Sequence, residues 1–170
     1  LSILSAPAGT ELIIIEMGAS HQGEIRTLCT IARPDYGLIT NIGTAHLEGF
    51  GSFENIVKAK TELYEYLRKT NGVAIYNDRN PLLSEQIYRS VNRAVPYSAP
   101  DGTELIVEPV SYSKNLVVRL IHNKKERVIS TGFFGRHNTE NIRAAVAVSV
   151  FLGAGIDDAA AAIEEYKPLN

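Results

Sequence analysis

The chain has 170 residues, 45% of them hydrophobic, with 17 basic and 19 acidic side chains and a formal charge of −2. This length favours one well-filled core, and the lack of a basic excess argues against nucleic acid as a partner. The single cysteine, Cys29, allows no internal disulfide, which fits a reducing cytoplasm. Residues 1–10 lack the features of an export signal, and no apolar run could span a bilayer, so we expect a cytoplasmic monomer without membrane insertion.

Strands and helices alternate in the first half of the predicted fold. Residues 12–15 are a short, wholly apolar run that ends at Glu16, which predicts a strand covered on both faces in a parallel sheet. A helix over 23–32 is stopped by Pro34, and Ser52 is the expected cap of a helix that runs to about residue 68. The remaining elements are strands at 36–40 and 73–76 and a helix at 81–91.

The pattern then changes to antiparallel strands. We expect them at 104–110, 116–121 and 127–131, the last two joined by a polar turn at 122–125. A helix over 138–152 follows, and Asp157 opens a final helix. The predicted fold class is α/β: a doubly wound, mostly parallel sheet with a small antiparallel β extension, in a single domain of residues 1–170.

Polar side chains follow each of the three predicted parallel strands. Glu16 follows the first, Asn41 and then His46 the second, and Asn77 and Asp78 the third. Because open α/β sheets bind ligands beyond the carboxyl ends of their strands, these groups are candidates for a divalent-cation site. The alternative for each residue alone is a solvated carboxylate or an ordinary loop histidine.

Lys60 is the polar member of an apolar helical face. An ammonium on such a face is costly unless paired, so the lysine either loses its proton or meets a fixed partner. A neutral amine can take up carbon dioxide as a carbamate, an anion able to bind a metal. The alternative is a lysine at the edge of the face that reaches water, as Lys58 does elsewhere on the helix. The face consists of Ile56, Ala59, Lys60, Leu63, Tyr64 and Leu67.

Two asparagines stand three residues apart at the start of the predicted helix 138–152. The amides of Asn138 and Asn141 should therefore project from one side. Each amide offers a donor and an acceptor, which suits the edge of an adenine ring. The alternative is that Asn138 simply caps the helix.

Five blocks of sequence resemble the central domain of the Mur ligases. Their order and coverage of the whole chain make the resemblance specific to this family, which has a P-loop ligase-like central domain. The amino-acid sequence of these blocks is most similar to the branch that adds D-alanyl-D-alanine to UDP-N-acetylmuramoyl-tripeptide in peptidoglycan precursor synthesis. The blocks are Glu16-Met17-Gly18-Ala19, Gly23-Glu24-Ile25, residues 40–52, Ala59-Lys60-Thr61-Glu62, and Gly135-Arg136-His137-Asn138 with Asn141.

The resemblance implies roles for the metal-binding and catalytic candidates. Glu16 matches the glutamate that binds the magnesium ion bridging the ATP phosphates, and His46 matches the histidine that binds a second magnesium ion. Lys60 matches the lysine that carries a carbamate and supports that second ion. ATP and two Mg²⁺ ions are thus the implied cofactors.

The resemblance also implies contacts with nucleotide and substrate. Asn138 and Asn141 match asparagines near adenine, and Asn41 stands where a γ-phosphate contact is expected. Ser20 and His21 are candidates to face the muramoyl substrate. The implied reaction is amide bond formation, in which a peptide carboxylate attacks the γ-phosphate and the amine of D-alanyl-D-alanine then attacks the acyl phosphate.

Two features of the family's complete enzymes are missing from this chain. The chain contains no Gly-x-x-x-x-Gly-Lys-Ser/Thr loop, which the resemblance places before Leu1, and the family's third domain would follow Asn170. We therefore expect a central domain truncated at both ends, which folds but does not ligate by itself.

Three other functions fit parts of the pattern. A folylpolyglutamate-type or other Mur-type ligase shares much of the core, although residues 18–21, Gly-Ala-Ser-His, argue against folate. A non-catalytic nucleotide-binding module would need no carbamate at Lys60. A metallohydrolase built on His21, Glu16 and His46 lacks the paired histidines on one helix that such sites commonly use.

Overall fold

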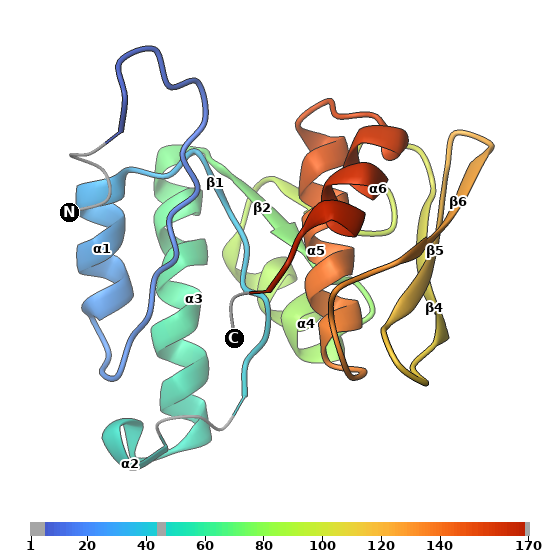
Figure 1. Cartoon of the computed structure of the whole chain (residues 1–170). Helices are drawn as coiled ribbons and strands as arrows, with labels where there is room; N and C mark the ends of the chain where they lie inside the picture. Colours follow the sequence, from blue (N-terminus) through green and yellow to red (C-terminus); the bar gives the residue numbers. More distant parts are fainter. Residues whose placement is uncertain (1–5, 44–46, 169–170) are drawn as a thin grey trace. The chain divides into compact units, whose positions relative to one another are not determined.

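The computed structural model describes residues 6–43 and 47–168 (Figure 1). The chain divides into two compact units, the first formed by Leu1–Ala74 with Gln86–Arg93 and the second by Ile75–Glu85 with Ala94–Asn170. Each unit is presented by itself below. In the described ranges, no helix is both long enough and apolar enough to cross a membrane.

The first unit is built around one long helix. Its elements are α1 (Glu24–Ala32), β1 (Tyr36–Gly37), α2 (Leu47–Phe50), α3 (Phe53–Thr70) and the start of β2 (Val73–Tyr76). β1 and β2 pair in parallel, with Tyr36 opposite Val73. α1 lies alongside α3 (Figure 1). A β-carbon at Gly37 would come within 3.0 Å of the Leu63 and Leu67 side chains, so the missing side chain lets α3 lie close over β1.

Helix α3 confirms the predicted Ser52 cap and the predicted apolar face. The Ser52 hydroxyl oxygen accepts a hydrogen bond from the backbone N–H of Asn55 at 3.2 Å, and Asn71 ends the helix in the left-handed region with φ of 58°. Tyr64 and Leu67 are fully buried, and Lys58 is exposed. The helical spacing therefore identified the buried side of α3.

The predicted strand at 12–15 is wrong. The segment has no regular structure, and Leu12, Ile13 and Ile14 are 51%, 46% and 83% exposed. A strand needs a neighbour to pair its backbone N–H and C=O groups, and none of the described strands pairs with this segment. The strand expected at 36–40 is also shortened to the two residues that pair with β2.

The second unit joins an antiparallel sheet to two helices. Its elements are β3 (Ala94–Pro96), β4 (Leu105–Ser111), β5 (Val117–His122), β6 (Lys125–Ser130), α5 (Asn138–Phe151) and α6 (Ile156–Glu165). Helix α4 (Pro81–Ser90) starts in this unit and ends in the other. Asn123 and Lys124, both with positive φ, form the two-residue turn between β5 and β6.

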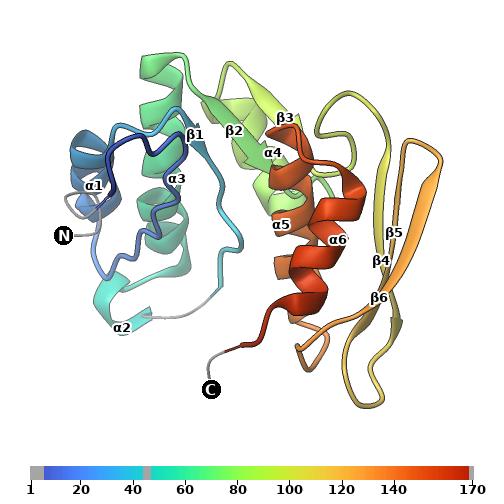
Figure 2. The ribbon, with the colours of Figure 1, turned by 45° about the horizontal axis from the view of Figure 1, so that its top comes forward.

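Helices α5 and α6 cover one face of the antiparallel sheet (Figure 2). Residues of β5 alternate in burial, with Val118 and Leu120 fully buried, because successive side chains point to opposite faces. Ile142 and Val146 of α5 are buried as well.

The three predicted antiparallel strands and both helices of this part are confirmed, with ends displaced by one to two residues. The fold class is α/β, as predicted, with a second sheet of order β1-β2-β3. Strand β3 was not predicted.

Candidate functional site

Three segments of the first unit meet on one side of α3. Phe50, Ile56 and Ala59 form a buried cluster, and Ala19 and Ile42 pack against it. Ala19 lies three residues after Glu16, Ile42 directly follows Asn41, and Ala59 directly precedes Lys60. The backbone segments that carry three predicted site residues therefore converge on the same apolar cluster.

Helix α2 approaches the same region. A β-carbon at Gly49 would stand 2.9 Å from the carbonyl oxygen of Ser20, so a side chain at this position would collide with the backbone. Glycine thus permits α2 to lie against the segment that follows Glu16.

Lys60 meets a fixed partner at this place. Its side chain is half-buried, and its Nζ donates a hydrogen bond to the carbonyl oxygen of Asn41 at 2.8 Å. Burial lowers the pKa of the Lys60 ammonium because the charged form loses hydration. The alternative of an ammonium extended freely into water does not describe this side chain. The carbonyl partner fixes the position of the amine, and burial alone lowers its pKa, so carbamate formation at Lys60 stays a prediction.

The other predicted cation ligands are placed less fully. Glu16 is exposed on the irregular segment that leads to Ala19, and His46 lies outside the described residues. Within 6–43 and 47–168, no three His, Cys, Asp or Glu side chains gather closely enough to hold a metal ion. The structure thus brings Asn41 and Lys60 together, and the ligand roles of Glu16 and His46 stay predictions.

Ser20 and His21 are held by the start of α1. The Glu24 carboxylate accepts hydrogen bonds from the backbone N–H groups of Ser20, at 2.6 Å, and His21, at 3.1 Å. These two hydrogen bonds lower the pKa of Glu24. His21 also lies 3.6 Å from Glu24, so its imidazole is already engaged, which does not favour the metallohydrolase alternative. The muramoyl-binding role of both residues stays a prediction.

Sequence reasoning missed the structural role of Glu62. Its carboxylate is 5% exposed and accepts hydrogen bonds from the backbone N–H groups of Gly23, at 2.7 Å, and Arg26, at 2.9 Å. These are free N–H groups of the first turn of α1, which has no cap from its own N-cap residue, Gly23. The spacing of Glu62 three residues after Ala59, on the buried side of α3, was the available signal.

The asparagine pair lies in the second unit. The Asn141 Nδ2 donates to Asn138 Oδ1 at 3.1 Å, so the two amides share one side of α5, as predicted. Asn138 Nδ2 donates to the carbonyl oxygen of Phe134 at 2.7 Å. The helix begins at Asn138 after His137, with no side-chain cap, so the capping alternative is wrong. Within the described ranges Asn141 Oδ1 accepts no hydrogen bond, leaving an acceptor for a ligand.

The polar residues after β2 serve the second unit. Asn77 is 6% exposed, and its Nδ2 donates to Glu140 at 2.7 Å. An Asp78 carboxylate oxygen accepts from the backbone N–H of Ser98 at 3.1 Å. Both belong to a different unit from Glu16 and Asn41, so a crevice common to all three strand ends stays a prediction.

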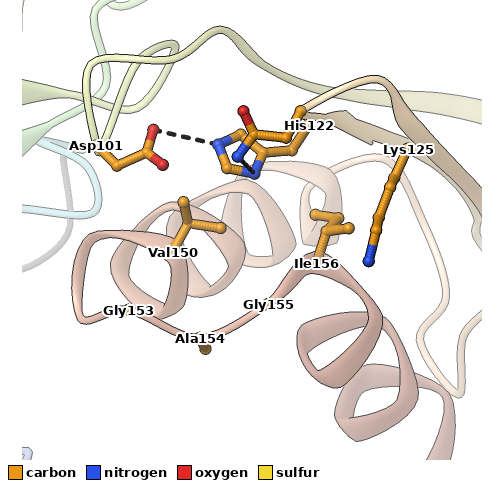
Figure 3. Close-up of a pocket in the computed structure, with 9 residues that line it drawn as sticks. Asp101, His122, Lys125, Val150, Gly153, Ala154, Gly155 and Ile156 are labelled. Carbon is orange, nitrogen blue, oxygen red and sulfur yellow. Dashed lines mark hydrogen bonds and ion pairs between the residues drawn. The ribbon is translucent and has the colours of Figure 1, made fainter.

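A cavity of about 280 Å³ lies elsewhere in the second unit, between the β5–β6 hairpin and the α5–α6 connection (Figure 3). His122 and Asp101 form its polar wall, joined at 3.1 Å, and Val150 and Ile156 its apolar wall. Val150 is twelve residues along α5 from Asn138, a helical rise of about 18 Å. The cavity includes none of the predicted site residues.

The predicted family resemblance is confirmed by comparison with known proteins. Residues 1–149 match the Mur ligase middle domain. UDP-N-acetylmuramoyl-tripeptide--D-alanyl-D-alanine ligase of Haemophilus influenzae is 35% identical over 171 residues, covering 100% of this chain and 37% of that protein. The enzyme of the same name from Bacillus subtilis is 34% identical over 170 residues, covering 98% of this chain and 35% of that protein. The chain thus spans little more than a third of the length of these relatives.

Solved structures give the same result. A MurF ligase from Thermotoga maritima in complex with ADP superposes with a TM-score of 0.75 and 28% identity, covering 99% of this chain and 39% of that one. MurF from Acinetobacter baumannii superposes with a TM-score of 0.72 and 29% identity, covering 90% of this chain and 34% of that one.

Proposed function

The chain belongs to the Mur ligase family, and we propose that its residues 1–170 act as the central, ATP-binding domain of a ligase that adds D-alanyl-D-alanine to UDP-N-acetylmuramoyl-tripeptide. The names of the H. influenzae and B. subtilis relatives support this substrate pair, and the ADP complex of the T. maritima relative supports ATP as the phosphoryl donor. The product is a peptidoglycan precursor, made in the bacterial cytoplasm by a monomeric enzyme.

The observation that carries the proposal is the hydrogen bond between Lys60 and Asn41. It joins the one ammonium on the buried side of α3 to the backbone beyond β1, at 2.8 Å. The segment that carries Glu16 packs beside it through Ala19. A lysine with a lowered pKa at such a junction is suited to carbamate formation, since the neutral amine is the form that attacks carbon dioxide.

The donor set fits the implied magnesium ions. Glu16 offers a carboxylate, His46 an imidazole and Lys60, as a carbamate, two further oxygens, which are ligand types for divalent cations. When bound, Mg²⁺ supplies positive charge between the γ-phosphate of ATP and the peptide carboxylate. Asn41 is assigned to the γ-phosphate, close to the Lys60 amine.

The second unit is proposed to hold the base. The free Oδ1 of Asn141 suits the exocyclic amino group of adenine, and Asn138 keeps the Asn141 amide in place through its own Oδ1. The peptide carboxylate, activated as an acyl phosphate, then reacts with the amine of D-alanyl-D-alanine, and phosphate leaves.

The test is phosphate release by the full-length protein. Turnover should require ATP, UDP-N-acetylmuramoyl-tripeptide and D-alanyl-D-alanine together. Lys60→Ala should abolish it, and a short-chain carboxylic acid, whose carboxylate can stand in for the missing carbamate, should partly restore it. Lys58→Ala, on the exposed side of the same helix, is the matched control and should retain full activity. Full turnover by the Lys60→Ala protein, or turnover without D-alanyl-D-alanine, would contradict the proposal.

A further inference from the structure

Glu140 joins three elements of the second unit. It lies in the first turn of α5, between the two asparagines. One carboxylate oxygen accepts a hydrogen bond from Nδ2 of Asn77, after β2, at 2.7 Å, and the other accepts from Nη1 of Arg143. Arg143 in turn donates through Nη2 to the carbonyl oxygen of Val107, on β4, at 2.8 Å. The start of α5 is thereby connected to two different strands.

The partners of Glu140 are buried. Asn77 is 6% exposed and Arg143 is 8% exposed, whereas the side chain of Glu140 is 48% exposed. Hydrogen bonds to a carboxylate are stronger than those between neutral groups, and the two buried partners hold the carboxylate from its inner side. The negative charge of Glu140 also acts on the buried Tyr97 hydroxyl. Burial and this carboxylate together raise the pKa of Tyr97 to about 12.

The direction of each side chain follows from the helix. Successive residues turn by about 100°, so Asn138 and Asn141 lie about 60° apart, whereas Glu140 points about 160° away from Asn138. The asparagines thus share one side of α5, and the half-exposed Glu140 points away from them, towards the buried side chains of Asn77 and Arg143. These two hydrogen bonds of Glu140 fix the rotation of the first turn of α5 about the helix axis.

We propose that Glu140 is a positioning residue, which sets the first turn of α5 so that Asn138 and Asn141 present a preformed edge to a purine with an exocyclic amino group. The inference rests on the proposed function, since it needs the base to bind at Asn141. It adds a specificity element that acts through other residues: Glu140 itself does not contact the base. Rigid amides discriminate between bases because their donors and acceptors stay in fixed positions. An amide that is free to rotate can instead form a hydrogen bond with the wrong base.

The experiment compares binding of ATP and ITP, whose base has a carbonyl oxygen in place of the amino group, to the full-length protein. Glu140→Gln keeps the size of the side chain and weakens its hold on Arg143. We expect the ratio of ITP to ATP dissociation constants to fall by about tenfold, the factor that one hydrogen bond is worth. The affinity for inorganic tripolyphosphate, which has no base, should not change. Glu164→Gln, at an exposed position of α6, is the matched control and should leave the ratio unchanged.

A second variant guards against misfolding. Asn77→Ser removes the tie to β2 and leaves the Glu140–Arg143 pair in place, so it should lower the same ratio by a smaller factor. All measurements are made well below the thermal midpoint of each variant. A merely stabilising role for Glu140 would lower that midpoint and leave the ratio unchanged, which would overturn the inference.

The asparagines separate this inference from the function on which it rests. If Asn141→Ala lowers the ratio and neither Glu140→Gln nor Asn77→Ser does, the positioning role is wrong and base recognition stands. If Asn141→Ala also leaves the ratio unchanged, the base does not bind at Asn141, and that part of the proposed function fails together with this inference.

Discussion

The carboxylate of Glu62 accepts a hydrogen bond from the backbone N–H of Gly23 at 2.7 Å, across 39 residues of chain. A residue of α3 thus caps α1, and with it orders the end of the segment that carries Glu16.

Replacing Glu62 should destabilise the chain. Glu62→Ala leaves the N–H groups of Gly23 and Arg26 without their partner in a partly buried setting, which costs about 2 kcal/mol. Urea unfolding followed by circular dichroism measures the change. Glu65→Ala, three residues later and 46% exposed, should cost less than about 1 kcal/mol. Equal losses for the two variants would contradict the capping role.

Lys60 should make stability depend on alkaline pH. Its folded-state pKa is lowered by burial, so between that value and the ordinary 10.5 the unfolded chain binds more protons than the folded one. The free energy of unfolding therefore rises with pH across this window. Below the window the Lys60 ammonium is charged in both states, and the full cost of burying that charge lowers stability. Lys60→Met should abolish the rise, as measured by denaturant unfolding at a series of pH values. A rise that persists in Lys60→Met has another source.

Glu24 should contribute an acid-sensitive part of stability. Hydrogen bonds from Ser20 and His21 lower its folded pKa below 4.5, so its contribution is present above pH 4.5 and is lost as pH falls through the folded value. Thermal unfolding of Glu24→Gln should show a weaker pH dependence in this acidic window than the unaltered chain. Glu164, an exposed acid that accepts no such hydrogen bond from the residues the structure describes, provides the comparison, and Glu164→Gln should leave the pH dependence as it was.

Tyr97 carries a buried hydroxyl with no hydrogen-bond partner among the described residues. Tyr97→Phe should therefore change stability by less than about 1 kcal/mol. Its pKa is raised by burial from 10.0 to about 12, so the unfolded chain ionises first and stability falls as pH rises between these values. The phenylalanine variant should lose that fall, whereas Tyr88→Phe, at a site 84% exposed, should keep it. Ultraviolet absorbance at alkaline pH follows the ionisation directly.

Local patterns predicted much of the fold. The apolar face of α3, its Ser52 cap, the turn at Asn123 and the shared side of Asn138 and Asn141 all follow from periodicity and short-range backbone chemistry. Such features depend on residues a few positions apart, which the chain itself brings together.

Residues 12–15 show where that reasoning stops. Their composition is that of a buried strand, yet they form none, because a strand also requires a partner whose backbone groups lie beside it. Glu62 and Glu140 are the converse case, because long-range partners give them structural roles that the sequence pattern did not indicate. In the sequence, each looks like an ordinary acidic residue on a helix. In the structure, Glu62 accepts a hydrogen bond from Arg26, 36 residues away, and Glu140 accepts one from Asn77, 63 residues away.

The sequence by itself determined the family, every described helix except α2 and the candidate amine at Lys60, because the relevant spacings are short and the motifs are contiguous. Only the tertiary structure decided that Lys60 meets the carbonyl oxygen of Asn41 and that Asn77 holds Glu140. Those contacts form when distant segments pack against a common core. No periodic pattern in the sequence indicates where a particular carbonyl or amide group will lie after packing.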